Sequence, residues 1–178
     1  MALSVDPALA IALRAGLALL LVAAALHKLR DLAAFRAALA GYRLLPERAL
    51  GAAAAAFALA ELGAAGALVL GERGGEAAAC LFALYSCAIG VNLLRGRREI
   101  DCGCFGPALR QPLSGALVAR NAPLIALAGV CALPVRARAL VPLDAFTIAA
   151  LIVFGALVWG GVNGLLANAP RLRALRGT

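Results

Sequence analysis

The sequence predicts an all-helical protein that crosses a membrane several times as one integral membrane domain over residues 1–178. Apolar residues make up 64% of the chain, and the mean hydropathy is +0.94, well above the range of soluble domains. The apolar residues form five long stretches between charged segments, and none alternates as a barrel strand would. Because lipid offers the backbone no hydrogen-bond partner, each stretch must pair its own backbone groups and is predicted to be helical.

Each of the five stretches has about the 20 residues that a helix needs to cross the hydrocarbon layer. In chain order, the predicted spans are 7–26, 49–70, 77–94, 114–133 and 143–167.

A shorter helix is predicted between the first two spans. Its apolar residues recur at steps of three and four: Leu29, Leu32, Phe35, Leu39 and Tyr42. Charged residues fall largely between them, which is the pattern of an amphipathic helix lying in the membrane interface and ending near Gly41 and Pro46. Two roles are open for it: a membrane anchor, or a lid beside the cysteine-containing loop on the same side.

The charged connections predict the orientation. We name the side that holds the N-terminus side A and the opposite side B. The connections on side A carry three basic residues: Arg73, Arg136 and Arg138. Those on side B carry twelve: Lys28, Arg30, Arg36, Arg43, Arg48, Arg95, Arg97, Arg98, Arg110, Arg171, Arg173 and Arg176. The positive-inside rule therefore predicts that side B is cytoplasmic, with the N-terminus outside and the C-terminus inside.

The same distribution accounts for the net charge of +8. The positive charge lies where the anionic headgroups of the lipid bilayer are, and no nucleic-acid-binding pattern accompanies it. We expect no nucleic-acid partner.

The motif with the clearest chemistry is Asp-Cys-Gly-Cys-Phe-Gly at 101–106, in the side B connection between the third and fourth spans. Gly103 permits the sharp bend that a disulfide between Cys102 and Cys104 needs. A ring this small is strained, and strained disulfides exchange readily. One thiolate would attack the disulfide of a partner and the other would resolve the mixed disulfide, in an order that the sequence leaves open.

Two other interpretations of the motif stay open. Two thiolates also suit a soft metal ion such as Cu(I), with His27 on the same side as a nitrogen ligand, in a binding or transport protein. A purely structural thiol pair, in a scaffold for a maturation complex, is the third interpretation.

Charged residues inside spans are usually paired or functional. Arg14 and Glu61 lie at similar depths from side A, so we expect an ion pair between the first two spans, as a structural tie or as a proton or quinone site. Arg120 lies near side B, close in depth to His27 and Asn92, where it would reach the headgroups or stabilise a cysteine thiolate.

Cys80 and Cys131 both lie within one or two helical turns of side A. A second thiol pair at this depth would let reducing equivalents cross the membrane. Ordinary core packing of small residues is the alternative.

Several of these residues carry a resemblance to a known family. They are His27-Lys28-Leu29-Arg30-Asp31, Phe35, Tyr42 with Leu44-Leu45-Pro46, Glu61, Tyr85, Asn92-Leu93 and the motif at 101–106. The chain thereby resembles the methylamine-utilisation MauE family, within the wider DoxX-like group of redox-associated membrane proteins. The resemblance covers about residues 7–133, and the span 143–167 is an addition without a signature.

The resemblance implies a four-helix core in a bacterial inner membrane and a role in the maturation of methylamine dehydrogenase. It implies a thioredoxin-like, MauD-type partner and a periplasmic client protein that needs disulfides. Cys102 and Cys104 would be the exchange pair, and a quinone is implied as an electron sink. The candidates for supporting residues, taken from their depth and chemistry, are His27, Glu61, Asn92, Asp101 and Arg120. A periplasmic client conflicts with a cytoplasmic cysteine loop, so either electrons cross the membrane or one span is misassigned.

Overall fold

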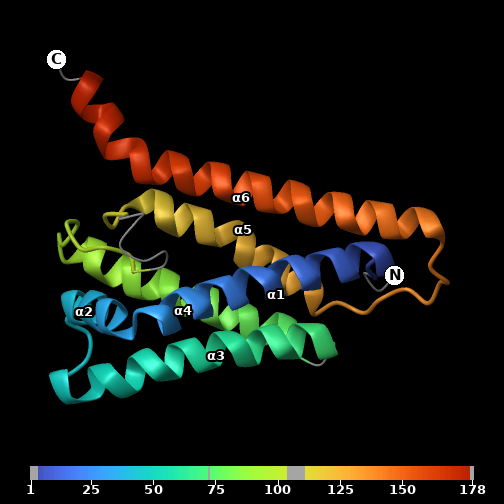
Figure 1. The fold of residues 1–178 in the computed structure, drawn as a ribbon, viewed down its shortest axis with the longest axis horizontal. Coiled ribbons are helices and arrows are strands. Elements are labelled where there is room, and N and C mark those ends of the chain that lie inside the picture. Colours follow the sequence, from blue (N-terminus) through green and yellow to red (C-terminus); the bar gives the residue numbers. More distant parts are fainter. Residues whose placement is uncertain (1–3, 72, 104–110, 177–178) are drawn as a thin grey trace.

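The computed structural model describes residues 4–71, 73–103 and 111–176, and these residues form a bundle of helices without a named strand (Figure 1). The elements in order are α1 (Pro7–Arg30), α2 (Leu32–Tyr42), the 3-10 turn η1 (Glu47–Ala49), α3 (Leu50–Leu70), α4 (Gly74–Leu94), α5 (Gly115–Cys131) and α6 (Pro142–Arg176). The five long helices run up and down, and α2 lies at one end of them. The all-helical bundle and its additional short helix are confirmed.

The lengths and apolar composition of the described helices are those of a multi-pass membrane protein. Four helical stretches are long and apolar enough to cross a membrane: Pro7–Arg30, Glu47–Leu70, Gly74–Leu94 and Pro142–Ala169. Helix α5 has 17 residues and spans about 26 Å, slightly less than the hydrocarbon layer. The predicted span 114–133 is therefore a helix of the bundle, but a shorter one than expected.

Side-chain caps decide where the chain turns. Asp6 precedes α1, and its Oδ1 accepts a hydrogen bond of 2.9 Å from the N–H of Ala8, while Pro7 occupies the first helical position. Asp31 follows the last residue of α1 and also caps α2, because its Oδ1 accepts a hydrogen bond of 2.8 Å from the N–H of Ala34. Helix α1 therefore runs four residues beyond its predicted end before the chain bends into α2.

Small residues let the helices approach closely. Ala54, Ala58, Ala78 and Ala128 are completely buried. A Cβ on Gly75 of α4 would lie 2.6 Å from the carbonyl oxygen of Ala128 on α5, so only glycine fits there. The main core lies between α1, α3, α4 and α5, and the outward face of α6 is exposed and apolar, as a lipid-facing surface requires.

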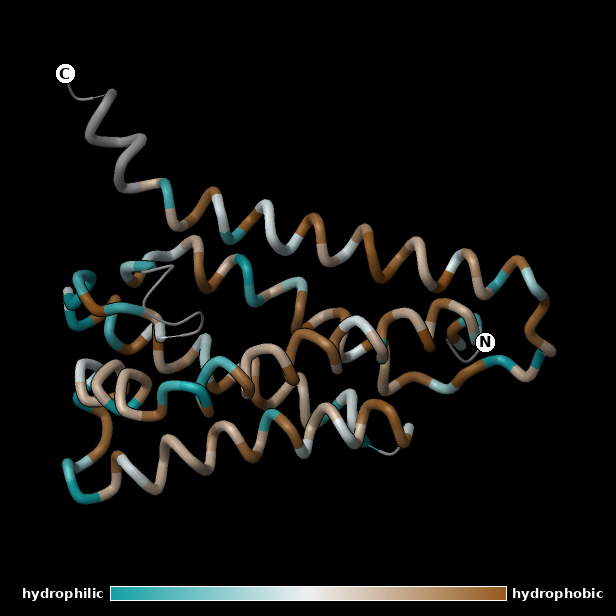
Figure 2. Tube along the Cα trace, in the orientation of Figure 1, coloured by the Kyte–Doolittle hydropathy of each residue, from teal (hydrophilic) through white to brown (hydrophobic). Residues whose placement is uncertain are grey.

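Polar residues gather at the two ends of the bundle (Figure 2). The N-terminus, the α3–α4 turn and the α5–α6 connection lie at one end, side A. Helix α2, the α4–α5 connection and the C-terminal end of α6 lie at the other, side B. The described part of the cysteine motif, Asp101 to Gly103, is therefore on the same side as α2, as predicted.

Candidate functional site

Asp101, Cys102 and Gly103, which we call the cysteine segment, are held by hydrogen bonds against the chain at Gln111 and Pro112. Asp101 and Pro112 form an antiparallel bridge, and the N–H of Cys102 donates to the carbonyl of Gln111 at 2.9 Å. Asp101 Oδ1 accepts from the N–H of Gly103 at 3.3 Å and from that of Gln111 at 3.2 Å. Cys104, the other predicted exchange cysteine, lies outside the described residues.

Helix α2 packs directly on this segment. Tyr42 donates its hydroxyl to the carbonyl of Cys102 at 3.2 Å. Gly103 has a φ of +72°, and a Cβ at this position would lie 2.9 Å from the Cβ of Ala38. Cys102 itself is only 7% exposed, in a small core with Tyr42 and Ile89. Glycine between the two cysteines is thus required by backbone conformation and by the closeness of α2.

A cavity of about 650 Å³ opens beside the segment on side B. Its lining comes from the end of α1, from α2 and from the cysteine segment: His27, Lys28, Asp31, Ala34, Phe35, Ala37, Ala38, Ala40, Gly41, Arg43, Arg97, Glu99, Ile100, Asp101 and Gly103. Two predicted supporting residues, His27 and Asp101, therefore meet at one cavity. Helix α2 forms a wall of it, which is the position that a lid would occupy.

Glu61 is paired with a residue that the sequence did not indicate. Its Oε1 accepts 2.5 Å from Nζ of Lys28 and 2.8 Å from the hydroxyl of Tyr85. The Lys28 ammonium also lies 5.1 Å from the ring centre of Phe35 and 5.4 Å from that of Tyr85. Lys28 was counted among the interfacial basic residues, yet it is buried inside the bundle.

The predicted Arg14–Glu61 ion pair is wrong. Arg14 Nη2 donates instead to the carbonyl of Cys131 at 3.1 Å, and its guanidinium lies near Gly71 at the side A end of α3. Side chains on a helix lean toward its N-terminus. Because α1 and α3 are antiparallel, Arg14 leans toward side A while Glu61 leans toward side B, where Lys28 leans inward to meet it. Comparing depths of Cα atoms alone missed this.

A second buried network holds Arg120, another predicted supporting residue. Arg120 Nη1 donates 2.7 Å to Oδ1 of Asn163 and 3.3 Å to Oε1 of Gln111, and Nη2 donates 3.3 Å to Oδ1 of Asn121. The Trp159 ring lies 5.0 Å from the guanidinium. Since Gln111 also binds the backbone of Cys102, Arg120 is connected to the cysteine segment through one residue.

Sequence reasoning missed Gln111 and Asn163. Asn163 is a polar residue within an apolar span, a signal that was available. Nothing in the sequence around Gln111 indicated a role, because its side-chain partners, Arg120 and Asn163, lie further along the chain on α5 and α6.

The remaining predicted residues are not brought to the cavity. Asn92 is buried in α4, where its amide nitrogen donates to the carbonyl of Ala88 at 3.1 Å. Cys80 is exposed on α4, whereas Cys131 is buried on α5, and both are free thiols. The structure therefore contains no disulfide between Cys80 and Cys131, the suggested second thiol pair. Among the described residues, no group of three or more His, Cys, Asp and Glu side chains is placed to hold a metal ion.

Comparison with known proteins agrees with this architecture. The family model for "Methylamine utilisation protein MauE" matches residues 6–134. The chain is 43% identical to the methylamine utilization protein MauE of Paracoccus denitrificans over 127 residues, which cover 70% of this chain and 68% of the relative. It is 40% identical to the protein of that name from Paracoccus versutus over 137 residues, 75% of this chain and 74% of the relative.

A third relative extends the match through the last helix. The methylamine utilization protein MauE of Methylorubrum extorquens is 38% identical over 173 residues, 92% of this chain and 93% of its own length. No solved structure matches the chain. Because the family model covers most of the chain and one relative aligns over 92% of it, this membrane helix bundle belongs to the MauE family of methylamine utilisation proteins.

Proposed function

We propose that this protein is a membrane thiol–disulfide exchange protein that assists disulfide formation in a periplasmic client during methylamine utilisation. Its direct partner is a thioredoxin-like protein of the MauD type. Cys102 and Cys104 form the exchange pair. Support comes from membership of the MauE family and from the way the structure builds the surroundings of Cys102.

The observation that carries the proposal is the position of the cysteine segment at the rim of the side B cavity. Asp101 and Gly103 line a cavity of about 650 Å³, within the usual range of ligand sites. Hydrogen bonds fix the backbone of Cys102 on both its N–H and its carbonyl. The Cys102 side chain itself is buried beside Tyr42 and Ile89, so its neighbours Asp101 and Gly103 are the part of the motif that a partner segment in the cavity would contact first.

A single exchange balances without a further reactant. With the pair reduced, one thiolate attacks the partner's disulfide, breaks its S–S bond and forms a mixed disulfide, while the leaving sulfur takes up a proton. The second cysteine loses its proton and attacks the mixed disulfide. A Cys102–Cys104 disulfide and a reduced partner result, so two electrons and two protons have moved to the partner. The reverse sequence is the one that assists disulfide formation: a thiolate of the reduced partner attacks the Cys102–Cys104 disulfide, the partner leaves oxidised, and the pair keeps two electrons and two protons. A second disulfide-bearing protein then has to take these electrons by the same exchange before the next cycle.

The cavity fits a polypeptide better than the quinone that the family resemblance implied. Six charged side chains line it: Lys28, Asp31, Arg43, Arg97, Glu99 and Asp101. The remaining wall is apolar and comes mainly from the alanines and Phe35 of α2. A protein segment can use both walls, with its backbone and polar side chains on the charged one and its apolar side chains on α2. We therefore route no step through a quinone.

The proposed partner docks on side B. The positive-inside rule favours a cytoplasmic side B in an inner membrane, while a periplasmic client favours the opposite orientation. A membrane-impermeant thiol reagent applied to spheroplasts separates the two. Labelling of Cys102 or Cys104 from outside would place side B in the periplasm, and labelling only after permeabilisation would place it in the cytoplasm.

Trapping of the mixed disulfide tests the exchange. The Cys102→Ser and Cys104→Ser variants each retain one thiol, so one of them should accumulate a reducible covalent adduct with the thioredoxin-like partner. The Cys80→Ser/Cys87→Ser variant is the control, because it removes two exposed thiols outside the segment and should leave trapping unchanged. The proposal fails if neither single variant forms an adduct, or if a double Cys102→Ser/Cys104→Ser variant supports full maturation of the client.

A further inference from the structure

The buried ion pair of Lys28 and Glu61 lies next to the proposed exchange site but has no role in it so far. Lys28 is 4% exposed and Glu61 is 1% exposed. Burying two charges costs more than their attraction commonly returns, so such a pair is weak support for stability alone. An intramembrane pair of this kind calls for a functional explanation.

One carboxylate oxygen of Glu61 accepts two hydrogen bonds and the other accepts none in the described part of the chain. Lys28 and Tyr85 both donate to Oε1, while Oε2 is buried without a hydrogen-bond partner in the described part of the chain. Lys28 donates to Oε1, so a proton that Lys28 passes on arrives there and neutralises the carboxyl, while Oε2 can accept from the ammonium in turn. The pair can therefore take up and release one proton by moving a hydrogen bond from Oε1 to Oε2.

The pair is connected to the cysteine segment through the cavity. Lys28 lines the cavity together with Asp101 and Gly103. The ring of Phe35 lies between them, because its centre is 5.1 Å from Nζ of Lys28 and its edge would lie 3.5 Å from a Cβ on Gly103. The cavity is large enough to hold water around the Phe35 ring, and we infer that this water carries protons between the backbone next to Cys102 and the ammonium group.

We propose that Lys28, Glu61 and Tyr85 form a proton-storage site for thiol–disulfide exchange at Cys102 and Cys104. The inference rests on the exchange function proposed above. When a cysteine thiol is deprotonated for attack, its proton moves through cavity water and Lys28 to Glu61. When the partner's sulfur leaves as a thiolate, the proton returns by the same route. The storage site gains and loses one proton at each step, and its net change over the reaction is zero.

Other titratable groups also face this space. They are His27 on α1, Asp31 at the start of α2, Arg43 at its end, and Arg97, Glu99 and Asp101 in the segment before Cys102. All are shared by the variants below, so a difference between variants reports on the pair.

The test compares exchange rates with oxidised glutathione across pH, in a Cys80→Ser/Cys87→Ser background that removes the exposed thiols. Single loss of Lys28 or Glu61 would leave an unpaired buried charge and endanger folding. The informative variant is therefore Lys28→Met/Glu61→Gln, which removes both charges while keeping side-chain volume. Glu47→Gln is the matched control, because Glu47 is an exposed carboxylate at side B outside the cavity. Thermal melting of each purified protein confirms its fold.

We expect the double variant to exchange about 10- to 100-fold more slowly than the parent near neutral pH, the lower part of the usual range for proton-transfer assistance. The deficit should shrink as the pH rises, because hydroxide then removes the thiol proton without help from the pair. Glu47→Gln should match the parent throughout.

A double variant that exchanges as fast as the parent, or more slowly by the same factor at every pH, would overturn the storage site and leave the exchange function standing. A parent protein that does not exchange with oxidised glutathione or with the thioredoxin-like partner would overturn the exchange function, and the storage site with it.

Discussion

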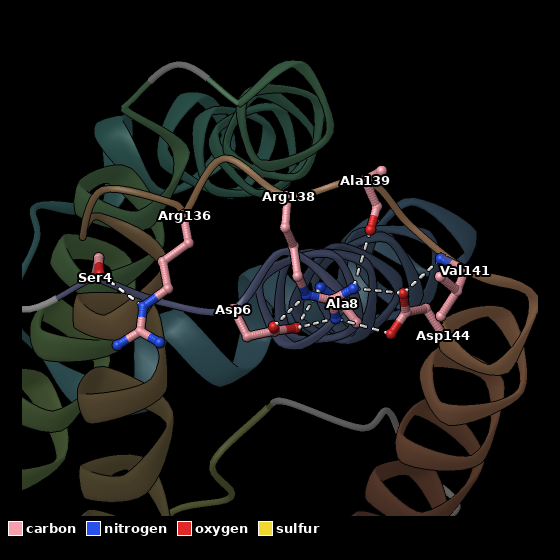
Figure 3. Close-up of polar contacts among 8 residues, drawn as sticks. All are labelled: Ser4, Asp6, Ala8, Arg136, Arg138, Ala139, Val141 and Asp144. Atoms are coloured by element: carbon pink, nitrogen blue, oxygen red, sulfur yellow. Dashed lines mark hydrogen bonds and ion pairs between the residues drawn. The ribbon is translucent and has the colours of Figure 1, made fainter.

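Each end of the bundle contains an ion pair between a basic side chain and a carboxylate, but one pair is exposed and the other is buried. At side A, Arg138 binds Asp6 at 2.7 Å and Asp144 at 2.7 Å, and thereby joins the start of α1 to the start of α6 (Figure 3). The Arg138 and Asp6 side chains are 37% and 43% exposed. At side B, the Lys28–Glu61 pair is almost completely buried.

The difference in burial indicates that the side A pair has a structural role and the side B pair a chemical one. Exposed ion pairs are screened by water and salt and contribute little each, so the side A group acts as one of several ties. The backbone supplies others, since Val5 donates to the carbonyl of Pro134 at 2.9 Å and accepts from the N–H of Arg136 at 2.8 Å. The buried pair at side B is sensitive to each partner and lies beside the cysteine segment. We expect side A to tolerate change and side B to resist it.

The largest effect should come from breaking the buried pair on one side only. Lys28→Met or Glu61→Gln leaves an uncompensated buried group and should lower the free energy of unfolding by about 3–5 kcal/mol. The double variant should be much closer to the parent. Unfolding in detergent micelles measures this, and single variants as stable as the parent would show that the pair is not buried in the membrane protein.

A smaller effect should come from the glycine between the two cysteines. Gly103→Ala forces a left-handed conformation on alanine, at about 1–2 kcal/mol, and also brings its Cβ against Ala38. Gly96→Ala is the matched control, because Gly96 has the same φ of +72° but nothing within 4 Å of its Cβ position. The excess cost of Gly103→Ala over Gly96→Ala therefore measures the contact with α2.

The companion change Ala38→Gly removes the Cβ that Gly103→Ala meets. In a double-mutant cycle, Ala38→Gly should recover the excess cost of Gly103→Ala, apart from the roughly 1 kcal/mol that glycine costs inside a helix. Equal costs for the Gly96 and Gly103 variants would contradict the docking of α2 on the cysteine segment.

The smallest effect should come from Arg138→Gln at side A. The hydrogen bond from Arg138 lowers the pKa of Asp6 below its ordinary 3.8. A carboxyl with a lowered folded-state pKa stabilises the fold above its unfolded pKa, and this contribution is lost as the pH falls through the folded value. The melting temperature of the variant should therefore be slightly below that of the parent, by a constant amount from neutral pH to about pH 5.

Below a pH of 3.8 the difference should narrow as Asp6 becomes protonated in the parent. A large loss of stability in Arg138→Gln, or a difference that varies around neutral pH, would contradict the assignment of this group as an exposed tie.

The same contrast explains how far the sequence predicts the structure. Span positions follow from local hydropathy, so the predicted 49–70 and the observed Leu50–Leu70 nearly coincide. The last helix was less well predicted, because polar residues after Ala167 hid a continuation to Arg176. Helix α2 followed from the spacing of Phe35, Leu39 and Tyr42, of which Phe35 and Tyr42 are buried as the pattern requires.

The site was predictable only where its chemistry is local. The Cys-Gly-Cys motif is local, and its place on the same side as α2 follows from the order of the spans, but the Tyr42–Cys102 contact joins residues 60 apart and could not be read from spacing. The partner of Glu61 depends on how two antiparallel helices incline their side chains, and the Arg120 network depends on Gln111 and Asn163, which are 52 residues apart. Sequence spacing does not report such contacts.

The central claim, that Cys102 and Cys104 exchange electrons as a pair, is tested most directly by an equilibrium redox titration in membranes. Samples poised at graded ratios of reduced to oxidised dithiothreitol are alkylated, and each cysteine is scored by mass spectrometry. We predict that Cys102 and Cys104 lose reactivity together in one two-electron transition, while the extent of alkylation of the free thiols Cys80 and Cys87 does not change with the ratio. Alkylation of Cys102 and Cys104 that is independent of the ratio would contradict the account.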